Sequence, residues 1–273
     1  MQFPEIVKQD GMREPFRPHK LLMSLIHSGA EKAIAESIVA HIESEVADGD
    51  TTSTIYKHAF SLLKKNRARI PAARYSMKRA IRELGPSGFP FEDFVAEIFK
   101  AQGYKTKTGI MMQGSCALHE VDMIAEKEGR RIGAEMKFHN NLGITSDLKV
   151  ALYVDARFND LRGHGVDEGI LITNTRFTEN AVQYGNCRKL KMISWSYPHE
   201  GNLQNLIEET GVQPITALPS LSKREKELLL GEGLVLCRML SAKPAILHSI
   251  FSEKKLNDVI AESQALCTSN KKV

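Results

Sequence analysis

Cysteine is scarce in this chain, and none of its four cysteines stands in a C-x-x-C pair. Cys116, Cys187, Cys237 and Cys267 lie far apart, which excludes the paired spacing of a zinc ribbon or of a thioredoxin-like redox motif. We therefore expect free, reduced thiols and a cytoplasmic protein.

Long apolar runs are absent as well. The first ten residues include Glu5, Lys8 and Asp10 in place of an apolar signal region, and no stretch is long and apolar enough to cross a bilayer. We expect neither a secretory signal nor a membrane partner. The sequence also lacks G-x-x-x-x-G-K-[ST], so a nucleotide-hydrolysing P-loop is not supported.

Acidic residues are missing from residues 51–82, a stretch with the pattern of helices. Its charged side chains are all basic: Lys57, Lys64, Lys65, Arg67, Arg69, Arg74, Lys78, Arg79 and Arg82. Solvent-exposed helices usually carry acidic residues that pair with basic ones at i,i+4. A stretch whose charges are all positive therefore indicates contact with a polyanion or a nucleotide. A solvated helix face is the alternative.

Turn-rich segments divide the 273 residues into three parts. Residues 85–88, Gly-Pro-Ser-Gly, follow a helical N-terminal third, and the proline-containing segment 211–222 reads as a second linker. We predict domains over residues 1–85, 86–214 and 215–273. The middle part has more acidic than basic residues although the whole chain carries +4, which favours a carboxylate-lined site there.

One segment of the middle part combines two apolar runs, a tight turn and two acids. Residues 121–139 read VDMIAEKEGRRIGAEMKFH, and a turn at Glu128-Gly129 makes residues whose numbers sum to 257 antiparallel partners. Asp122 then faces Glu135. Carboxylates with Cβ atoms about 5 Å apart repel each other unless a cation lies between them, and hard oxygen ligands suit magnesium or manganese.

Alternation gives the second strand of this hairpin two different faces. Ile132, Ala134, Met136 and Phe138 share one face, and Arg131, Gly133, Glu135 and Lys137 share the other. The first face predicts core, and the second carries chemistry or meets solvent. A half-exposed hairpin with solvated charges is the alternative, and a bulge in the turn would move Asp122 to the opposite face.

The hairpin and its neighbours resemble the Mrr-like restriction endonucleases of the PD-(D/E)XK superfamily. Asp122 matches the motif aspartate and Glu135-Met136-Lys137 matches the E-x-K element. GFPFEDFVAEIFKAQGY at residues 88–104 resembles the family's opening helix, with Glu92 in the position of an accessory acid, and GILITNTRFTENAVQYG at residues 169–185 resembles its later strand and helix.

The chain departs from the family pattern at two places. Leu118-His119-Glu120 stands where these proteins often carry Gly-Asp-x-Gly, and Glu135 stands where they often carry glutamine. The second departure restores the superfamily's ordinary carboxylate. The first leaves open which kind of DNA is recognised.

The resemblance implies an α/β, restriction-endonuclease-like core, a mixed central sheet flanked by helices, and a metal-dependent DNA endonuclease. Asp122 and Glu135 would hold Mg²⁺ or Mn²⁺ with the Met136 carbonyl, and Lys137 would position or deprotonate the attacking water. Glu92 would complete the shell or position a second ion. The alternatives are a non-cleaving, nucleotide-responsive DNA-binding regulator and an RNA-directed or junction-specific nuclease.

The N-terminal part opens with a short hairpin, turning at Asp10-Gly11, and a helix opened by Pro18-His19-Lys20. With Asp48-Gly49-Asp50-Thr51-Thr52 and Ala72-Ala73-Arg74-Tyr75, this layout resembles the mainly helical ATP-cone, the nucleotide-sensing domain of ribonucleotide reductases and some regulators. The resemblance implies ATP or dATP as a regulatory ligand. Its implied contacts are Lys8 and Lys20 on the phosphates, Glu14 and Thr52 on the nucleotide, and Arg82 closing the site. Without the resemblance, Lys8 and Lys20 read as surface charges.

Three further features are open to more than one interpretation. Residues 148–161 predict a helix with Val150, Tyr153, Val154, Phe158 and Leu161 toward the sheet, and with Lys149, Arg157 and Arg162 left for solubility or a DNA backbone. His119 and His139, beside the hairpin, are structural or orient water. Residues 221–267 predict three or four short helices that pack as a small helical domain, hold a DNA backbone or form a homo-oligomer.

Overall fold

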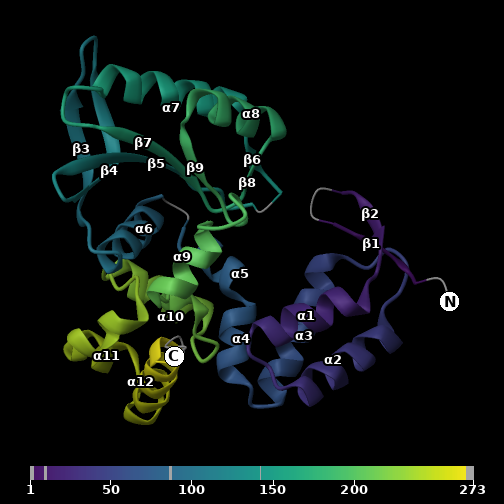
Figure 1. Cartoon of the computed structure of the whole chain (residues 1–273). Helices are drawn as coiled ribbons and strands as arrows, with labels where there is room; N and C mark the ends of the chain where they lie inside the picture. Colours follow the sequence, from purple (N-terminus) through teal and green to yellow (C-terminus); the bar gives the residue numbers. More distant parts are fainter. Residues whose placement is uncertain (1–2, 9–10, 86–87, 142, 269–273) are drawn as a thin grey trace.

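The computed structural model describes residues 3–8, 11–85, 88–141 and 143–268. Asp10 of the first predicted turn, and Pro86 and Ser87 of the first predicted linker, lie outside these ranges. In Figure 1 the α/β part lies at the upper left, the helical N-terminal part at the lower right and the C-terminal helices at the lower left. No helix in the described ranges is long and apolar enough to span a membrane.

The N-terminal part is a two-stranded hairpin followed by five helices. Strands β1 and β2 pair antiparallel, as predicted from the turn. The elements are β1 (Glu5–Val7), β2 (Arg13–Pro15), α1 (Pro18–His27), α2 (Lys32–Glu45), α3 (Thr52–Lys65), α4 (Arg69–Tyr75) and α5 (Met77–Arg82). Leu25, Ile38 and Leu63 are among the side chains of a separate core beneath the hairpin, which holds α1, α2 and α3 together.

The middle part is a mixed five-stranded sheet in the order β3-β4-β5-β7-β9. Strands β3, β4 and β5 are antiparallel, and β5, β7 and β9 are parallel. Its elements are α6 (Phe89–Ala101), β3 (Lys105–Gln113), β4 (Leu118–Lys127), β5 (Arg130–Lys137), β6 (Thr145–Ser146), α7 (Leu148–Leu161), β7 (Glu168–Thr173), β8 (Arg176–Phe177), α8 (Glu179–Arg188), β9 (Lys191–Ile193) and α9 (Leu203–Thr210). Helices α7 and α8 lie on one side of the sheet and α6 on the other (Figure 1), which agrees with the predicted α/β class.

The β4–β5 hairpin has the predicted register. Met123 pairs with Ala134 and Ile124 with Gly133, so the numbers of partners sum to 257. The turn residues Glu128 and Gly129 have φ values of 52° and 77°, the pair of positive values that a two-residue type I′ turn requires. No bulge shifts the strands between the turn and Met123, so the predicted faces of β5 are correct.

Both faces of β5 are covered, but by different groups. Ile132, Ala134 and Met136 are buried in the core shared with α6. On the opposite face, Gly133 and Gly169 are register partners on β5 and β7, and Phe158 of α7 lies over both. A Cβ on Gly133 would lie 2.5 Å from a Phe158 ring atom, and one on Gly169 would lie 2.3 Å away. The glycines therefore let α7 approach the sheet closely.

Helix α7 has the predicted bounds, but the prediction that Tyr153 faces the sheet is wrong. Ala151, Val154, Phe158 and Leu161 form the buried stripe. Tyr153 is 58% exposed, because it lies about 100° around the helix from Val154 and outside that stripe.

The C-terminal part is helical, as predicted, with the elements η1 (Ile215–Ala217), α10 (Lys223–Gly231), η2 (Cys237–Ala242), α11 (Pro244–Ile250) and α12 (Glu253–Thr268). Helix α12, with 16 residues, is longer than the short helices that the sequence predicted. They share one continuous core with α6 and the sheet. The segment expected to be an exposed linker is instead buried over Val212–Leu218, because its apolar residues Ile215 and Leu218 pack into that core. All four cysteines are free, as predicted.

Candidate functional site

Asp122 lies where β4 is distorted. The β3–β4 ladder is interrupted at Gly109 and Asp122, and Gly109 has a φ of +61°. Val121 packs with α7 whereas Met123, two residues on, packs with α6. The Met136 N–H of β5 donates to Asp122 Oδ2 at 2.6 Å. Asp122 therefore lies beside β5 at the point where the hairpin ladder ends.

Glu135 forms an ion pair with Arg157, which the sequence analysis had wrongly left for solubility or contact with a DNA backbone. Arg157 Nη1 of α7 donates to Glu135 Oε2, and their side chains are only 10% and 16% exposed. The Arg157 guanidinium also lies 4.7 Å from the ring centroid of Tyr153 and donates to its hydroxyl. Glu135 and Arg157 are 22 residues apart in the sequence and lie on different elements, so the spacing of residues within α7 does not predict their ion pair.

The two acids of the hairpin, Asp122 and Glu135, are half-buried beside Arg157 and Lys137. Burial raises the pKa of Glu135 to about 7, and the charge of Asp122 adds to this, while Arg157 and Lys137 oppose it. Burial also raises the pKa of Asp122, against the Met136 N–H bond and the charge of Arg157. A carboxylate pair of this kind gains from a nearby cation.

Glu92 brings a third acid from α6. It lies in the first turn of that helix, and burial raises its pKa to about 7, followed by the charges of Asp122, Asp93, Glu120 and Glu135. Glu120 acts on all three acids, although the sequence interpretation did not assign it to the site. Its position two residues before Asp122 on the same strand was the available signal.

Lys137 is the last residue of β5, and its side chain is exposed. Its positive charge lowers the pKa of both Asp122 and Glu135. The four residues predicted for the catalytic site, Glu92, Asp122, Glu135 and Lys137, thus come from three elements and act on one another electrostatically.

The two histidines beside the hairpin have structural contacts. His119 Nε2 lies 2.7 Å from Asp160 Oδ2, and Asp160 also accepts the N–H groups of Cys116 and Ala117. This cluster ties the β3–β4 turn to the end of α7. His139 Nε2 lies 3.1 Å from Ser146 Oγ, and the backbone N–H of His139 donates to Asn174 Oδ1.

The donor set around Asp122 fits a hard divalent cation. Glu92, Asp122 and Glu135 offer carboxylate oxygens, the ligands that Mg²⁺ and Mn²⁺ prefer, and burial, with the charges of neighbouring acids, raises their pKa values. Mg²⁺ usually keeps several waters and needs only one or two carboxylates, so a closed protein cage is not required.

The residues predicted to contact a nucleotide fall into two neighbouring groups. Lys8 Nζ lies 3.0 Å and Lys20 Nζ 3.7 Å from Glu14 Oε2, and the hydrogen bond from Lys8 is the main influence that lowers the pKa of Glu14. A bridge between Val7 and Thr51 brings the hairpin next to the start of α3. Thr52 and Arg82 line a cavity of about 1280 Å³. Lys8, Glu14 and Lys20 are not part of its lining.

That cavity lies between the N-terminal helices and the segment from Trp195 to Gln213. Its basic lining consists of Lys57, Arg74, Lys78, Arg79 and Arg82, five of the basic residues of the acid-free stretch. Lys78 lies 5.8 Å from the Trp195 ring centroid, and burial lowers its pKa. Tyr56 stacks on Tyr75 at 5.1 Å, and burial raises the pKa of Tyr56 to about 12. Glu208 and Glu209 also line the cavity, and Arg79 pairs with Glu83. The cavity therefore offers an anionic ligand aromatic rings and more basic than acidic side chains.

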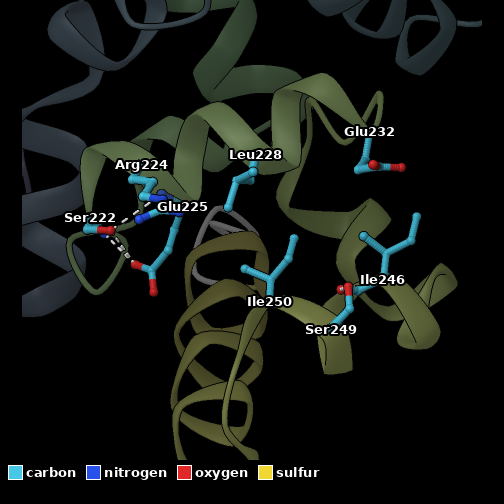
Figure 2. A pocket seen from close by; sticks show the side chains of 8 residues that line it. All are labelled: Ser222, Arg224, Glu225, Leu228, Glu232, Ile246, Ser249 and Ile250. Atoms are coloured by element: carbon cyan, nitrogen blue, oxygen red, sulfur yellow. Dashed lines mark hydrogen bonds between the residues drawn. The ribbon is translucent and has the colours of Figure 1, made fainter.

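A second cavity of about 610 Å³ lies in the C-terminal part (Figure 2). Leu228 and Ile250 point toward each other across it, while Ser222 and Glu225 are joined by hydrogen bonds at one end (Figure 2). These two form the capping box of α10, and Lys255 pairs with Glu225. Ser222 and Glu225 thus have structural partners.

Two family models match the chain. Residues 84–196 match the model described as restriction endonuclease, and residues 214–267 match the one described as AF1548-like, C-terminal. An uncharacterized protein of Archaeoglobus fulgidus is 39% identical over 172 residues, which are 62% of this chain and 98% of that protein.

Two solved structures are similar. The crystal structure of AF1548, a protein of unknown function, is 34% identical with a TM-score of 0.56, and the match covers 67% of this chain and all of that one. MspJI restriction endonuclease in complex with a 27-mer oligonucleotide is 15% identical with a TM-score of 0.35, over 70% of this chain and 39% of that one. The chain therefore belongs to the AF1548-like family and carries a restriction endonuclease domain over residues 84–196.

Proposed function

We propose that the chain is a magnesium-dependent DNA endonuclease that hydrolyses phosphodiester bonds. The observation that carries this proposal is that Asp122 accepts the N–H of Met136, the residue between Glu135 and Lys137, while Glu92 lies near enough for the charges of Asp122 and Glu135 to raise its pKa. The acids lie within the matched restriction endonuclease domain, which supports DNA as the substrate.

Each side chain has a separate task in this proposal. Asp122 and Glu135 would hold Mg²⁺ or Mn²⁺, with Glu92 completing the shell or positioning a second ion. When bound, the metal supplies charge stabilisation at the scissile phosphate and lowers the pKa of water. Lys137 orients the attacking water or accepts its proton. Arg157 fixes the carboxylate of Glu135 and favours its ionised form.

Regulation by ATP or dATP is the second part of the proposal. The resemblance of the hairpin and first helices to an ATP-cone supports it, together with the Lys8–Glu14–Lys20 group and the basic cavity that Thr52 and Arg82 line. Lys8 and Lys20 would meet phosphates, Glu14 and Thr52 would contact the nucleotide, and Arg82 would close the site. The free thiols are compatible with a reducing, cytoplasmic setting.

The test is incubation of several DNA substrates with the full-length protein and Mg²⁺. We expect cleavage by the wild type, its loss with EDTA, and its loss in Glu135→Gln. Glu126→Gln is the matched control, because Glu126 lies on the same hairpin but pairs with Arg131 at the far end. Equal cleavage by Glu135→Gln would count against the site.

A second candidate is a DNA-binding regulator that responds to a nucleotide without cutting. One observation favours it: Arg157 already occupies an oxygen of Glu135 that a metal would use. Metal-independent DNA binding that changes with ATP or dATP, along with a change in homo-oligomeric state and no cleavage of any substrate, would favour this candidate.

A further inference from the structure

Two histidines and a glutamate form a cluster on α2 and α3, apart from the sites described above. His41 and Glu45 are four residues apart on α2, and His58 lies on α3. One ligand atom of each lies within 4.8 Å of the other two. We propose that His41, Glu45 and His58 bind a divalent transition metal of the zinc class.

The distances between the donor atoms are close to those of a metal shell. His41 Nε2 lies 3.4 Å from Glu45 Oε1, and His58 Nδ1 lies 3.5 Å from Glu45 Oε2. Zinc binds nitrogen and oxygen at about 2.0–2.2 Å, so ligand atoms of a tetrahedral site lie roughly 3.4 Å apart. Small side-chain adjustments would close the shell.

The backbone that carries these ligands is held in place by the core. Ile42 on α2 is 2% exposed, and Ile55 and Ala59 on α3 are 9% and 0% exposed. Residues at i and i+4 lie on one helix face, which places His41 beside Glu45. The three ligands are exposed or half-buried over this fixed base, so a metal reaches them without unfolding the helices.

The chemistry of the donors selects the metal. Two imidazole nitrogens with one carboxylate suit zinc, nickel, cobalt or copper, whereas magnesium prefers oxygen donors alone. Three protein ligands leave a position for water. The bound metal would clamp α2 to α3, and α3 begins at Thr52, which lines the basic cavity.

A simpler interpretation is that Glu45 forms exposed ion pairs with protonated histidines, which contribute little to stability. The two interpretations differ in a measurable way. A metal site requires all three side chains at once and takes up one equivalent of metal, whereas ion pairs take up none.

The test is a zinc titration of metal-stripped, full-length protein in competition with a chromophoric chelator. An Asp122→Ala, Glu135→Ala background removes the candidate nuclease site. We expect one equivalent of zinc, at least tenfold weaker binding in His41→Asn and in His58→Asn, and loss of that equivalent in the double variant. His248→Asn, an exposed histidine on α11, is the matched control and should bind as the parent does.

Two further measurements distinguish this site from the free cysteines and from misfolding. Cobalt should give a spectrum without the intense thiolate charge-transfer band, and the stripped double variant should melt as the parent does. Zinc should raise the melting temperature of the parent and not of the double variant. Absence of zinc uptake by the parent, or undiminished uptake by the double variant, would overturn the proposal. All of these readouts are independent of DNA cleavage.

Discussion

The acidic site on the sheet and the basic cavity beside the N-terminal helices differ in how they are built. Asp122 and Glu135 lie on neighbouring strands, and the Met136 N–H of β5 holds Asp122 Oδ2 just beyond the end of the backbone ladder. The lysines and arginines of the cavity lie on helices and face a segment more than a hundred residues away. Like charges on rigid strands require a cation, whereas cations around an open cavity attract an anion. The comparison predicts a metal at the first place and a phosphate-bearing ligand at the second.

The largest effect is expected at the acidic site. Lys137→Ala should lower DNA cleavage about 100-fold or more, the usual range for a group that handles a proton in the reaction. Lys105→Ala, an exposed lysine at the start of β3, is the control and should retain activity. The rates should be compared on one duplex substrate in Mg²⁺. Equal rates for the two variants would remove Lys137 from the proposed chemistry.

Helix α7 contacts the acidic site through Arg157 and packs on the sheet through Phe158. A side chain that pushes α7 away from the sheet should therefore lower the stability of the protein. In Gly169→Ala the new methyl group would meet Phe158 at 2.3 Å, and we expect the free energy of unfolding to fall by about 3 kcal/mol. Gly231→Ala, at the end of α10 with no atom within 4 Å, should be neutral or slightly stabilising. Urea unfolding monitored by circular dichroism measures both. If Gly169→Ala unfolds like the wild type, Phe158 does not lie over the paired glycines.

Removal of Arg157 tests whether a metal ion can replace the guanidinium beside Glu135. Arg157→Ala leaves Glu135 largely buried without its partner, and we expect a loss of about 2 kcal/mol in EDTA, after allowance for partial exposure. Mg²⁺ should restore more stability to this variant than it adds to the wild type. Thermal melts with EDTA and with Mg²⁺ make the comparison. An equal Mg²⁺ effect on both proteins would contradict a metal at Glu135.

The smallest effect is expected at the basic cavity. Arg82→Ala should weaken ATP or dATP binding about tenfold, roughly 1.4 kcal/mol, because one of several cations around the nucleotide is lost. Calorimetric titration measures the affinity. Lys65→Ala, in the same acid-free stretch but outside the cavity lining, is the control. Equal weakening in both variants would mean that general charge, rather than this cavity, attracts the nucleotide.

The sequence predicted the local part of the acidic site and missed its long-range part. A two-residue turn fixes the register of a hairpin, so the faces of β5 follow from residues 121–139 alone. The predicted pairing of Asp122 with Glu135 is not part of the ladder, which ends at Met123 because β4 is distorted at Asp122. The partner of Glu135 depends on how α7 packs, and that depends on Gly133 and Gly169 admitting Phe158. The periodicity of α7 does not indicate that Arg157 contacts Glu135. It also does not locate the edge of the buried stripe to within one residue, so it failed to predict that Tyr153 is exposed while Val154 is buried.

The N-terminal part shows the same limit. The hairpin and the first helix follow from local signals, but the cavity and the His41–Glu45–His58 cluster join side chains from elements that pack only in the folded chain. The buried segment at residues 212–218 was mistaken for a linker, because prolines near it signalled a turn while its apolar residues served the core.

The central claim is that Asp122 and Glu135 jointly hold a divalent cation. The most direct test is calorimetric titration of Mn²⁺ into full-length protein that carries His41→Asn and His58→Asn, so that only the acidic site remains in question. Adding Asp122→Asn or Glu135→Gln should each abolish the Mn²⁺ uptake that remains, while Glu126→Gln should leave it unchanged. Uptake that persists equally in all four proteins, or that never occurs, would contradict the account.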